Sequence, residues 1–226
     1  MGYFTPELFT FLRQLKRNNN RDWFNKNKER YIEEVQQPAL DFVASVGPGL
    51  RKISPNFMAD PRPVGGSMFR IYRDVRFAKD KSPYKTHVGL SFGHRSGKDV
   101  HAPGFYLHLE PGDVFLAAGI WHPDPKTANE IRTSIVERSA AWKKAAHAAP
   151  FSKSFRLSSD SLVRAPRGFD PEHPFVADLK RKDFIGIRAL DEKTATSARF
   201  LETFLKTCGD GSSLVRFLCE AVGVKY

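Results

Sequence analysis

Residues 69–85 read FRIYRDVRFAKDKSPYK, and the rest of the chain is most easily understood in relation to this stretch. Between Arg70 and Lys85 six basic side chains stand against two carboxylates, a local net charge of +4. At the period of a β-strand the apolar residues share one face. That face holds Phe69, Ile71, Val75 and Phe77, and the polar face holds Arg70, Tyr72, Asp74 and Arg76. Arg73 falls on the apolar side, so it meets a carboxylate or an anionic ligand there, or a β-bulge turns it outward.

The same stretch carries the spaced motif RxxRDxRFxxDKxxY. It resembles the signature of a widespread, mostly bacterial family of conserved hypothetical proteins, a domain of unknown function. The matching positions are Arg70, Arg73, Asp74, Arg76, Phe77, Asp80, Lys81 and Tyr84. The resemblance covers nearly the whole chain, including an Asn-Asn, Trp-Phe and Tyr pattern in residues 18–31 and the later His173-Pro174 pair. It implies no reaction and names no cofactor.

The composition indicates a globular protein. Of 226 residues 41% are hydrophobic and 12% aromatic, which is enough for a packed core. The net charge of +11 favours an anionic partner. No apolar run approaches the roughly 20 residues that cross a bilayer, and no secretion signal opens the chain, so we expect a cytoplasmic protein without a membrane partner. Cys208 and Cys219 are expected to be free thiols, and the sequence indicates no oligomeric state.

Helical signals dominate the first 50 residues. Thr5-Pro6-Glu7 predicts the start of a helix that runs to about Arg17. The asparagines at 18–20 predict a break capped on both sides, with a second helix from Asp22. A third helical segment is predicted from Pro38, ending where residues 47–49 read Gly-Pro-Gly.

From Met68 onward the apolar period changes to two, which predicts a sheet. Strands are expected at 88–92, 105–109, 114–121 and 184–190, helices from Asp124, at 195–207 and at 212–222, a tight turn at 110–113 and a surface loop at 94–103. The sequence thus predicts one α+β domain over residues 1–226, with a central, mainly antiparallel sheet packed with N-terminal and C-terminal helices. Its parts are a helical stretch at 1–50, a sheet-forming signature region at 65–121, and helices with one or two further strands at 122–226.

The polar face of this sheet is the predicted site. Besides the polar residues of the signature it carries His87, Gly89, Ser91, Tyr106, His108, Glu110, Ala117, Gly119 and Trp121. Small residues beside charged and aromatic ones predict a trough, and arginine forks suit phosphate or carboxylate oxygens. The predicted ligand-binding residues are Arg70, Tyr72, Arg73, Arg76, Lys81, Tyr84, His108 and Trp121, and the candidate acids or bases are Asp74 and Glu110.

The same face also contains residue types that bind metal ions. His87 and His108, with Asp74 or Glu110, would supply two imidazoles and a carboxylate. No close ligand pair such as HxH or HxxxH occurs, and isolated strand histidines are more often hydrogen-bonded structural residues. The sequence therefore assigns no metal.

Three functions follow from these residues. In the favoured function the protein, either an enzyme or a binding protein, binds a small anionic ligand. A phosphate-bearing ligand is preferred. An alternative is a nucleic-acid-binding module that stacks bases on Tyr72, Tyr84, Tyr106 or Trp121. The third is a non-catalytic interaction domain with a structural Arg-Asp network. A concave positive pocket favours the first, an extended basic stripe the second, and internal pairing of the signature residues the third.

Overall fold

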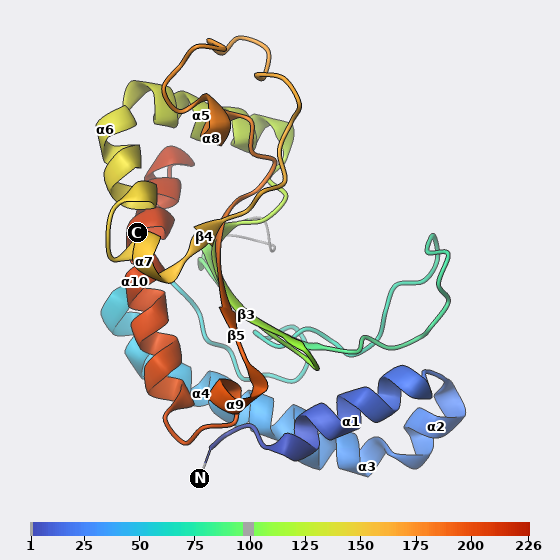
Figure 1. Ribbon diagram of the computed structural model, residues 1–226. Helices are drawn as coiled ribbons and strands as arrows, with labels where there is room; N and C mark the ends of the chain where they lie inside the picture. Colours follow the sequence, from blue (N-terminus) through green and yellow to red (C-terminus); the bar gives the residue numbers. More distant parts are fainter. Residues whose placement is uncertain (1, 97–101) are drawn as a thin grey trace.

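The structure, a computed structural model, describes residues 2–96 and 102–226 and has an α+β fold (Figure 1). Its helices are α1 (Pro6–Arg17), α2 (Arg21–Lys26), α3 (Lys28–Tyr31), α4 (Gln37–Ile53), α5 (Pro125–Glu137), α6 (Ser139–Trp142), α7 (Phe151–Ser154), α8 (Val176–Leu179), α9 (Glu192–Ala195) and α10 (Phe200–Ala221), with π-helical turns at Ile32–Gln36 and Lys143–His147. Its strands are β1 (Val88–Gly93), β2 (Gly104–Glu110), β3 (Asp113–Ile120), β4 (Arg156–Leu157) and β5 (Phe184–Leu190). Half of the loop predicted at 94–103 lies outside the described residues.

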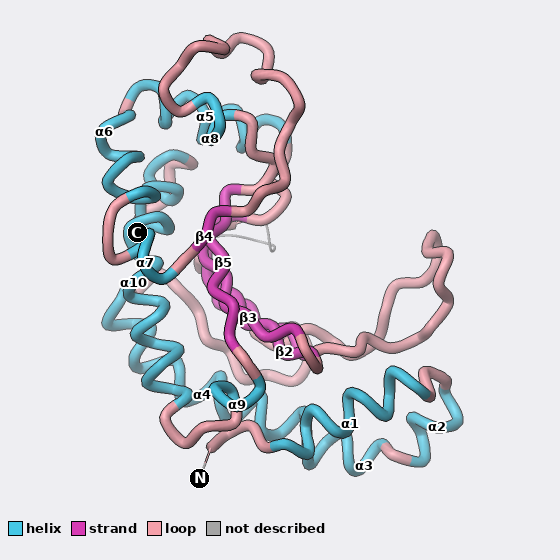
Figure 2. Tube along the Cα trace, viewed as in Figure 1, coloured by secondary structure: helices cyan, strands magenta, loops and turns pink. Residues whose placement is uncertain are grey.

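The strands lie in the order β1-β2-β3-β5-β4, and every neighbouring pair is antiparallel. Figure 2 shows the strands, in magenta, gathered in one sheet. This confirms the predicted hairpins and the strand at 184–190. The turn between β2 and β3 places Gly112 at a φ of 82°, a left-handed conformation that glycine adopts without strain. Glu110 and Asp113 consequently stand opposite each other at one end of the sheet.

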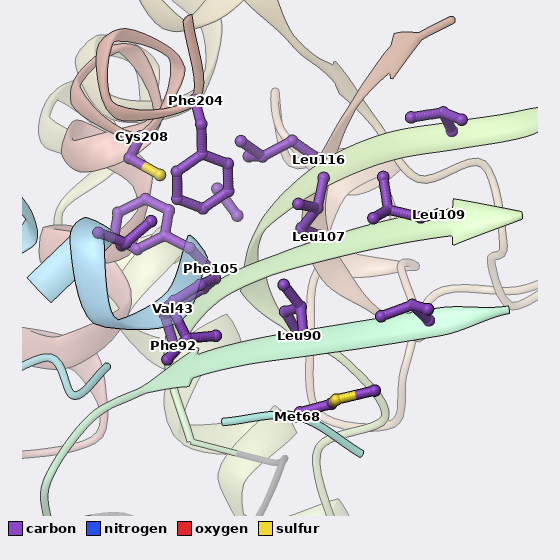
Figure 3. Close-up of a cluster of buried hydrophobic side chains, with 14 of the residues drawn as sticks. Val43, Met68, Leu90, Phe92, Phe105, Leu107, Leu109, Leu116, Phe204 and Cys208 are labelled. Carbon is purple, nitrogen blue, oxygen red and sulfur yellow. The ribbon is translucent and has the colours of Figure 1, made fainter. Parts of the chain in front are cut away.

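One face of the sheet is apolar and is covered by α4 and α10 (Figure 3). Leu90, Leu107 and Leu116 lie side by side on neighbouring strands and are fully buried. Val43 of α4 and Phe204 of α10 belong to the same cluster (Figure 3). Burying such a side chain contributes about 1.5–3 kcal/mol, so this face is the main source of stability. The opposite face is left to carry polar groups.

The ends of the first helices follow local sequence signals. The Asn18 side chain donates to the Gln14 carbonyl (2.9 Å) where α1 ends, and Asn20 Oδ1 accepts from the Trp23 N–H (2.9 Å) where α2 begins. The predicted break with asparagine at both ends is thus confirmed. None of the helices in the described part of the chain has the length and apolar content needed to span a membrane.

Two helix breaks predicted from glycine are wrong. α4 runs through Gly47-Pro48-Gly49, and α10 runs as one helix through Gly209-Asp210-Gly211. A Cβ at Gly49 would lie 2.3 Å from Leu205 Cδ1 of α10, and a Cβ at Gly211 would lie 2.9 Å from Ala118 Cβ of β3. These glycines therefore allow close packing. The apolar surface buried there outweighs the unfavourable helix propensity of about 1 kcal/mol for each glycine.

The strand predicted across residues 69–77 is also wrong. Only its beginning pairs with the sheet, where the Phe69 N–H donates to the Gly89 carbonyl (3.0 Å). The chain then leaves the sheet as a long projecting loop and returns at β1 (Figure 1). We call residues 70–87 the arm. The arm closes on itself through a single antiparallel bridge between Tyr72 and Tyr84.

Turn chemistry explains why the arm is not a strand. Asp74 Oδ1 accepts from the Arg76 N–H (3.2 Å), and Asp80 Oδ1 accepts from the Ser82 N–H (2.9 Å). Such Asx turns bend the backbone and compete with strand pairing. Phe77, assigned above to an apolar face, is consequently 95% exposed.

Candidate functional site

A hollow of about 370 Å³ lies where the base of the arm faces α1. It is lined by Lys16, Asn19, Arg73, Asp80, Ser82, Tyr84, Lys85, Thr86 and His87, and we call it the arm hollow. Three of these residues are cations, and Asp80 is the one carboxylate among these described lining residues. The arm hollow is therefore a concave site with a positive balance of charge.

The arm is fastened to the helices by Asn19. Its side-chain Nδ2 donates to the Tyr84 carbonyl (2.9 Å), and its Oδ1 accepts from the Tyr84 N–H (3.0 Å), as a neighbouring strand would do. The Tyr84 ring stacks on Phe24 of α2 with centroids 4.1 Å apart. Tyr84 is buried, and burial raises the pKa of its hydroxyl. Tyr84, predicted to bind ligand, thus acts as the anchor of the arm.

Arg73 is the signature arginine that reaches the arm hollow. It forms an ion pair with Asp80, whose carboxylate also accepts from the Ser82 hydroxyl (2.6 Å). The Ser82 hydroxyl and then Arg73 lower the pKa of Asp80, so this carboxylate is ionised at neutral pH. Arg73 is 30% exposed and Asp80 62%, which leaves the guanidinium partly open to the arm hollow.

The other signature residues lie further out on the arm. Arg76 pairs with Asp74 (2.7 Å) and is 76% exposed, and its hydrogen bond lowers the pKa of Asp74 to about 2. Lys81 Nζ donates to the Val75 carbonyl (3.0 Å). Arg70 is exposed and Tyr72 is half exposed, with its ring 5.4 Å from that of Tyr84. None of these side chains lines the arm hollow.

A second polar cluster lies beside the arm hollow, on the sheet face opposite the core. It consists of His87, His108 and Glu110, and we call it the histidine cluster. The imidazole rings of His87 and His108 have centroids 4.5 Å apart, and His108 Nε2 lies 3.5 Å from Glu110 Oε2. Glu110 Oε1 accepts from the Thr86 hydroxyl (3.0 Å) and lies 3.4 Å from Lys16 Nζ. His87 therefore belongs to both the cluster and the lining of the arm hollow, and Lys16 and Thr86 of that lining contact Glu110.

The surroundings of the histidine cluster keep its imidazoles neutral. Burial, and then the neighbouring His108, lower the pKa of His87 to about 4. Burial also lowers the pKa of His108. Burial opposes ionisation of Glu110, but hydrogen bonds from Thr86 and His108 outweigh it and lower its pKa. At neutral pH two neutral imidazoles thus stand beside an ionised carboxylate.

The alternation predicted for β1, β2 and β3 places these groups correctly, but the predicted trough is filled at Gly89. A Cβ there would lie 2.6 Å from the Tyr106 hydroxyl oxygen and 2.9 Å from the Phe69 ring. The open space lies instead at the end of the sheet, under the arm. Trp121 stacks on His122 (4.2 Å) just beyond the far end of β3, roughly 25 Å of strand from Asp113, and does not join the site.

A shallower hollow of about 420 Å³ lies on the other side of Lys16. It is lined by Arg13, Lys16, Arg17, Pro111, Gly112 and Glu192. Arg13 forms an ion pair with Glu192 (2.5 Å), and the three cations of this hollow all belong to α1, whereas those of the arm hollow come from two distant parts of the chain.

Sequence reasoning missed half of the residues around the arm hollow. Lys16 and Lys85 were not among the predicted ligand-binding residues, and Asn19 was interpreted as a helix cap. No local period connects these positions, because Asn19 and Tyr84 are 65 residues apart. The signal that was present is the motif itself, which contains Arg73, Asp80 and Tyr84.

Comparison with known proteins identifies the family of this chain. The model of a family described as "Conserved hypothetical protein (DUF2461)" matches residues 7–217, which is most of the chain. Searches of curated proteins and of solved structures found no match. The matched range contains α1 from its second residue onward, the arm and the whole sheet.

Proposed function

The chain belongs to the DUF2461 family of conserved hypothetical proteins, and we propose that it binds a small anionic ligand, preferably a phosphate-bearing one, in the arm hollow. The observation that carries this proposal is the meeting of Lys16, Arg73 and Lys85, from two distant parts of the chain, around one hollow. Asp80 pairs with Arg73 and Glu110 lies near Lys16, so the three cations outnumber the two carboxylates beside them, and an anion would neutralise the remaining charge. A guanidinium fork and two ammonium groups suit the oxygens of a phosphate.

The size of the arm hollow supports a small ligand. Its volume of about 370 Å³ is at the lower end of the range of roughly 300–1,000 Å³ for small-molecule sites. Ser82 and Thr86 add hydroxyl groups to the lining, which can donate to or accept from a ligand. Two carboxylates were predicted as acid or base. Glu110 lies next to the arm hollow, because it accepts a hydrogen bond from Thr86 of the lining, whereas Asp74 pairs with Arg76 further out on the arm.

The experiment is a calorimetric titration with pyrophosphate as the probe. We expect Arg73→Ala to weaken binding about tenfold or more, because hydrogen bonds to charged groups contribute about 1.5–3 kcal/mol. Arg76→Ala is the matched control, since it removes an arginine of the same arm that does not line the hollow. Asp80→Asn should strengthen binding, because it removes the carboxylate that competes for Arg73. Equal affinity of the wild type and Arg73→Ala would contradict the proposal.

A nucleic-acid-binding function is the second candidate, and one observation favours it. The outer arm combines an exposed Phe77 with Arg76, whose guanidinium lies 5.8 Å from the centroid of that ring. Aromatic and basic groups in this arrangement bind single strands by stacking and by charge. A fluorescence titration with a single-stranded oligonucleotide separates the two functions, because here Arg76→Ala and Phe77→Ala should weaken binding and Arg73→Ala should not.

The interaction-domain alternative depends on the arginine-aspartate pairs. Both pairs, Arg73 with Asp80 and Arg76 with Asp74, lie within the arm, and solvent reaches both: Arg76, Asp74 and Asp80 are exposed and Arg73 is partly exposed. Exposed pairs contribute little to stability, which argues against a mainly structural role. We also propose a cytoplasmic location, supported by the two free thiols Cys208 and Cys219.

A further inference from the structure

The histidine cluster has the composition of a metal site. His87, His108 and Glu110 each offer one ligand atom, and the three atoms lie within 4.8 Å of one another. We infer that these three residues bind one divalent transition-metal ion, such as Zn²⁺. Two imidazoles and one carboxylate are a ligand set that proteins use for such ions. This departs from the sequence analysis, which assigned no metal.

The spacing suits a metal ion after small side-chain movements. Zn²⁺ with bonds of about 2.0–2.2 Å and tetrahedral angles holds neighbouring ligand atoms about 3.4 Å apart. The 3.5 Å between His108 Nε2 and Glu110 Oε2 already matches this value. Both residues belong to β2, and His87 directly precedes β1, which pairs with β2. The backbone that carries the three ligands is therefore held by the sheet.

His108 and Glu110, the two ligands on β2, each have a hydrogen-bond partner at the polar atom that would not bind the metal. The Tyr106 hydroxyl lies 3.0 Å from His108 Nδ1, so His108 can donate from Nδ1 to this oxygen while Nε2 binds a metal. Glu110 Oε1 accepts from Thr86 and faces Lys16, which leaves Oε2 for the ion. Outer contacts of this kind orient metal ligands.

His87 separates the metal interpretation from a closed hydrogen-bond chain. Without metal, the Tyr106 hydroxyl can donate to His108, which in turn donates to Glu110, and both contacts are satisfied. His87 is left over. Its ring faces His108, yet it makes no hydrogen bond with any residue in the part of the chain that the structure describes. His87 is half buried and faces a second imidazole and a carboxylate, so its unpaired ring nitrogen is available to an ion bound between the three groups.

Three protein ligands leave coordination positions open. The cluster shares His87 with the lining of the arm hollow, so an open position would be next to that space. The metal proposal is independent of anion binding, since a metal ion alone is sufficient to test it.

The test is a titration of the full-length protein, first freed of metal with a chelator, with Co²⁺ followed by visible absorption. We expect one ion per chain, displaced by Zn²⁺. His87→Gln and Glu110→Gln should each weaken Co²⁺ binding about tenfold or more. Loss of an outer contact alone weakens metal binding about 10–100-fold, and loss of a ligand should cost at least as much. His108→Ala should do the same. The matched control is His122→Ala, because His122 is paired with Asp183 and lies outside the cluster.

Two results would overturn the inference. One is a metal-free wild-type protein that binds no Co²⁺, and the other is unchanged Co²⁺ binding in both His87→Gln and Glu110→Gln. Circular dichroism in the presence of chelator checks that each variant folds. His108 stacks on Phe115 (4.7 Å), so if His108→Ala is unfolded, the two glutamine variants decide the outcome.

Discussion

Asn19 shows how one side chain can hold a functional segment in place. Its amide makes two hydrogen bonds with the backbone of Tyr84, and through them the arm is joined to the end of α1. A carboxamide can do this because it donates and accepts at the same time. The position of Arg73 and Lys85 at the arm hollow therefore depends on a residue that has no charge.

We predict that Asn19→Ala loosens the arm without unfolding the protein. Two hydrogen bonds, each worth about 0.5–1.5 kcal/mol, would be lost. The Tyr84 amide should then exchange its hydrogen faster, and pyrophosphate should bind more weakly. Asn18→Ala is the control, because the Asn18 side chain contacts Gln14 within α1 and does not contact the arm. Unchanged exchange at Tyr84 in Asn19→Ala would show that Asn19 is not the anchor.

At the scale of elements, α10 shows why the glycines misled the sequence analysis. Gly209 and Gly211 are two residues apart and lie on different sides of the same helix, so their surroundings differ. A Cβ at Gly209 would meet no atom within 4 Å, whereas a Cβ at Gly211 would press on Ala118 and on the Phe155 ring. Gly209 thus lowers the helix propensity of α10 without any gain in packing, whereas Gly211 allows α10 to lie against β3.

The pair provides a matched prediction. Gly209→Ala should stabilise the protein by about 0.5–1 kcal/mol, because alanine is the better helix former. Gly211→Ala has the same gain in propensity but overpacks the core, which costs about 1–3 kcal/mol. Urea unfolding of both variants measures the difference. Equal stabilisation by the two substitutions would mean that α10 does not pack closely on the sheet.

The arm is the second element on which sequence and structure differ. Its apolar residues alternate as in a strand, but Asp74 and Asp80 bind their own backbone two residues further on. Alternation shows which side chains could share a face, and it contains no information on whether a partner strand is available. The signature therefore forms a projecting loop, and only Arg73 among its arginines lines the hollow.

On the scale of the whole molecule, the two cysteines report on cooperative unfolding. Cys208 and Cys219 are free and lie on α10, where both are buried. Burial raises the pKa of the Cys208 thiol, and it raises that of Cys219 to about 12, so neither is a thiolate at neutral pH.

We predict two reactive thiols per chain in the denatured, unreduced protein and none on a short timescale in the native protein. Titration with a thiol reagent, with and without denaturant, makes the measurement. Finding no reactive thiol after denaturation would indicate a disulfide, and rapid reaction of the native protein would show that α10 opens locally.

Local interactions were sufficient to predict much of this fold. The helix at Pro6–Arg17, the capped break at Asn18–Asn20 and the strands of the central sheet follow from signals within a few residues of each position. Helix caps, tight turns and the alternation of faces depend on neighbours along the chain, so they can be read directly from the order of residues. The motif also indicated that Arg73 and Asp80 belong to a special segment.

The site itself depends on contacts between distant parts of the chain. Lys16 of α1 meets Arg73 and Lys85 of the arm, and His87 meets Glu110, only because the arm folds back onto α1 and the sheet. The cost of closing such long loops is offset by burial around Tyr84 and in the core, which no local pattern reveals. Gly211 behaves likewise, since the packing of α10 on β3 outweighs its tendency to end a helix.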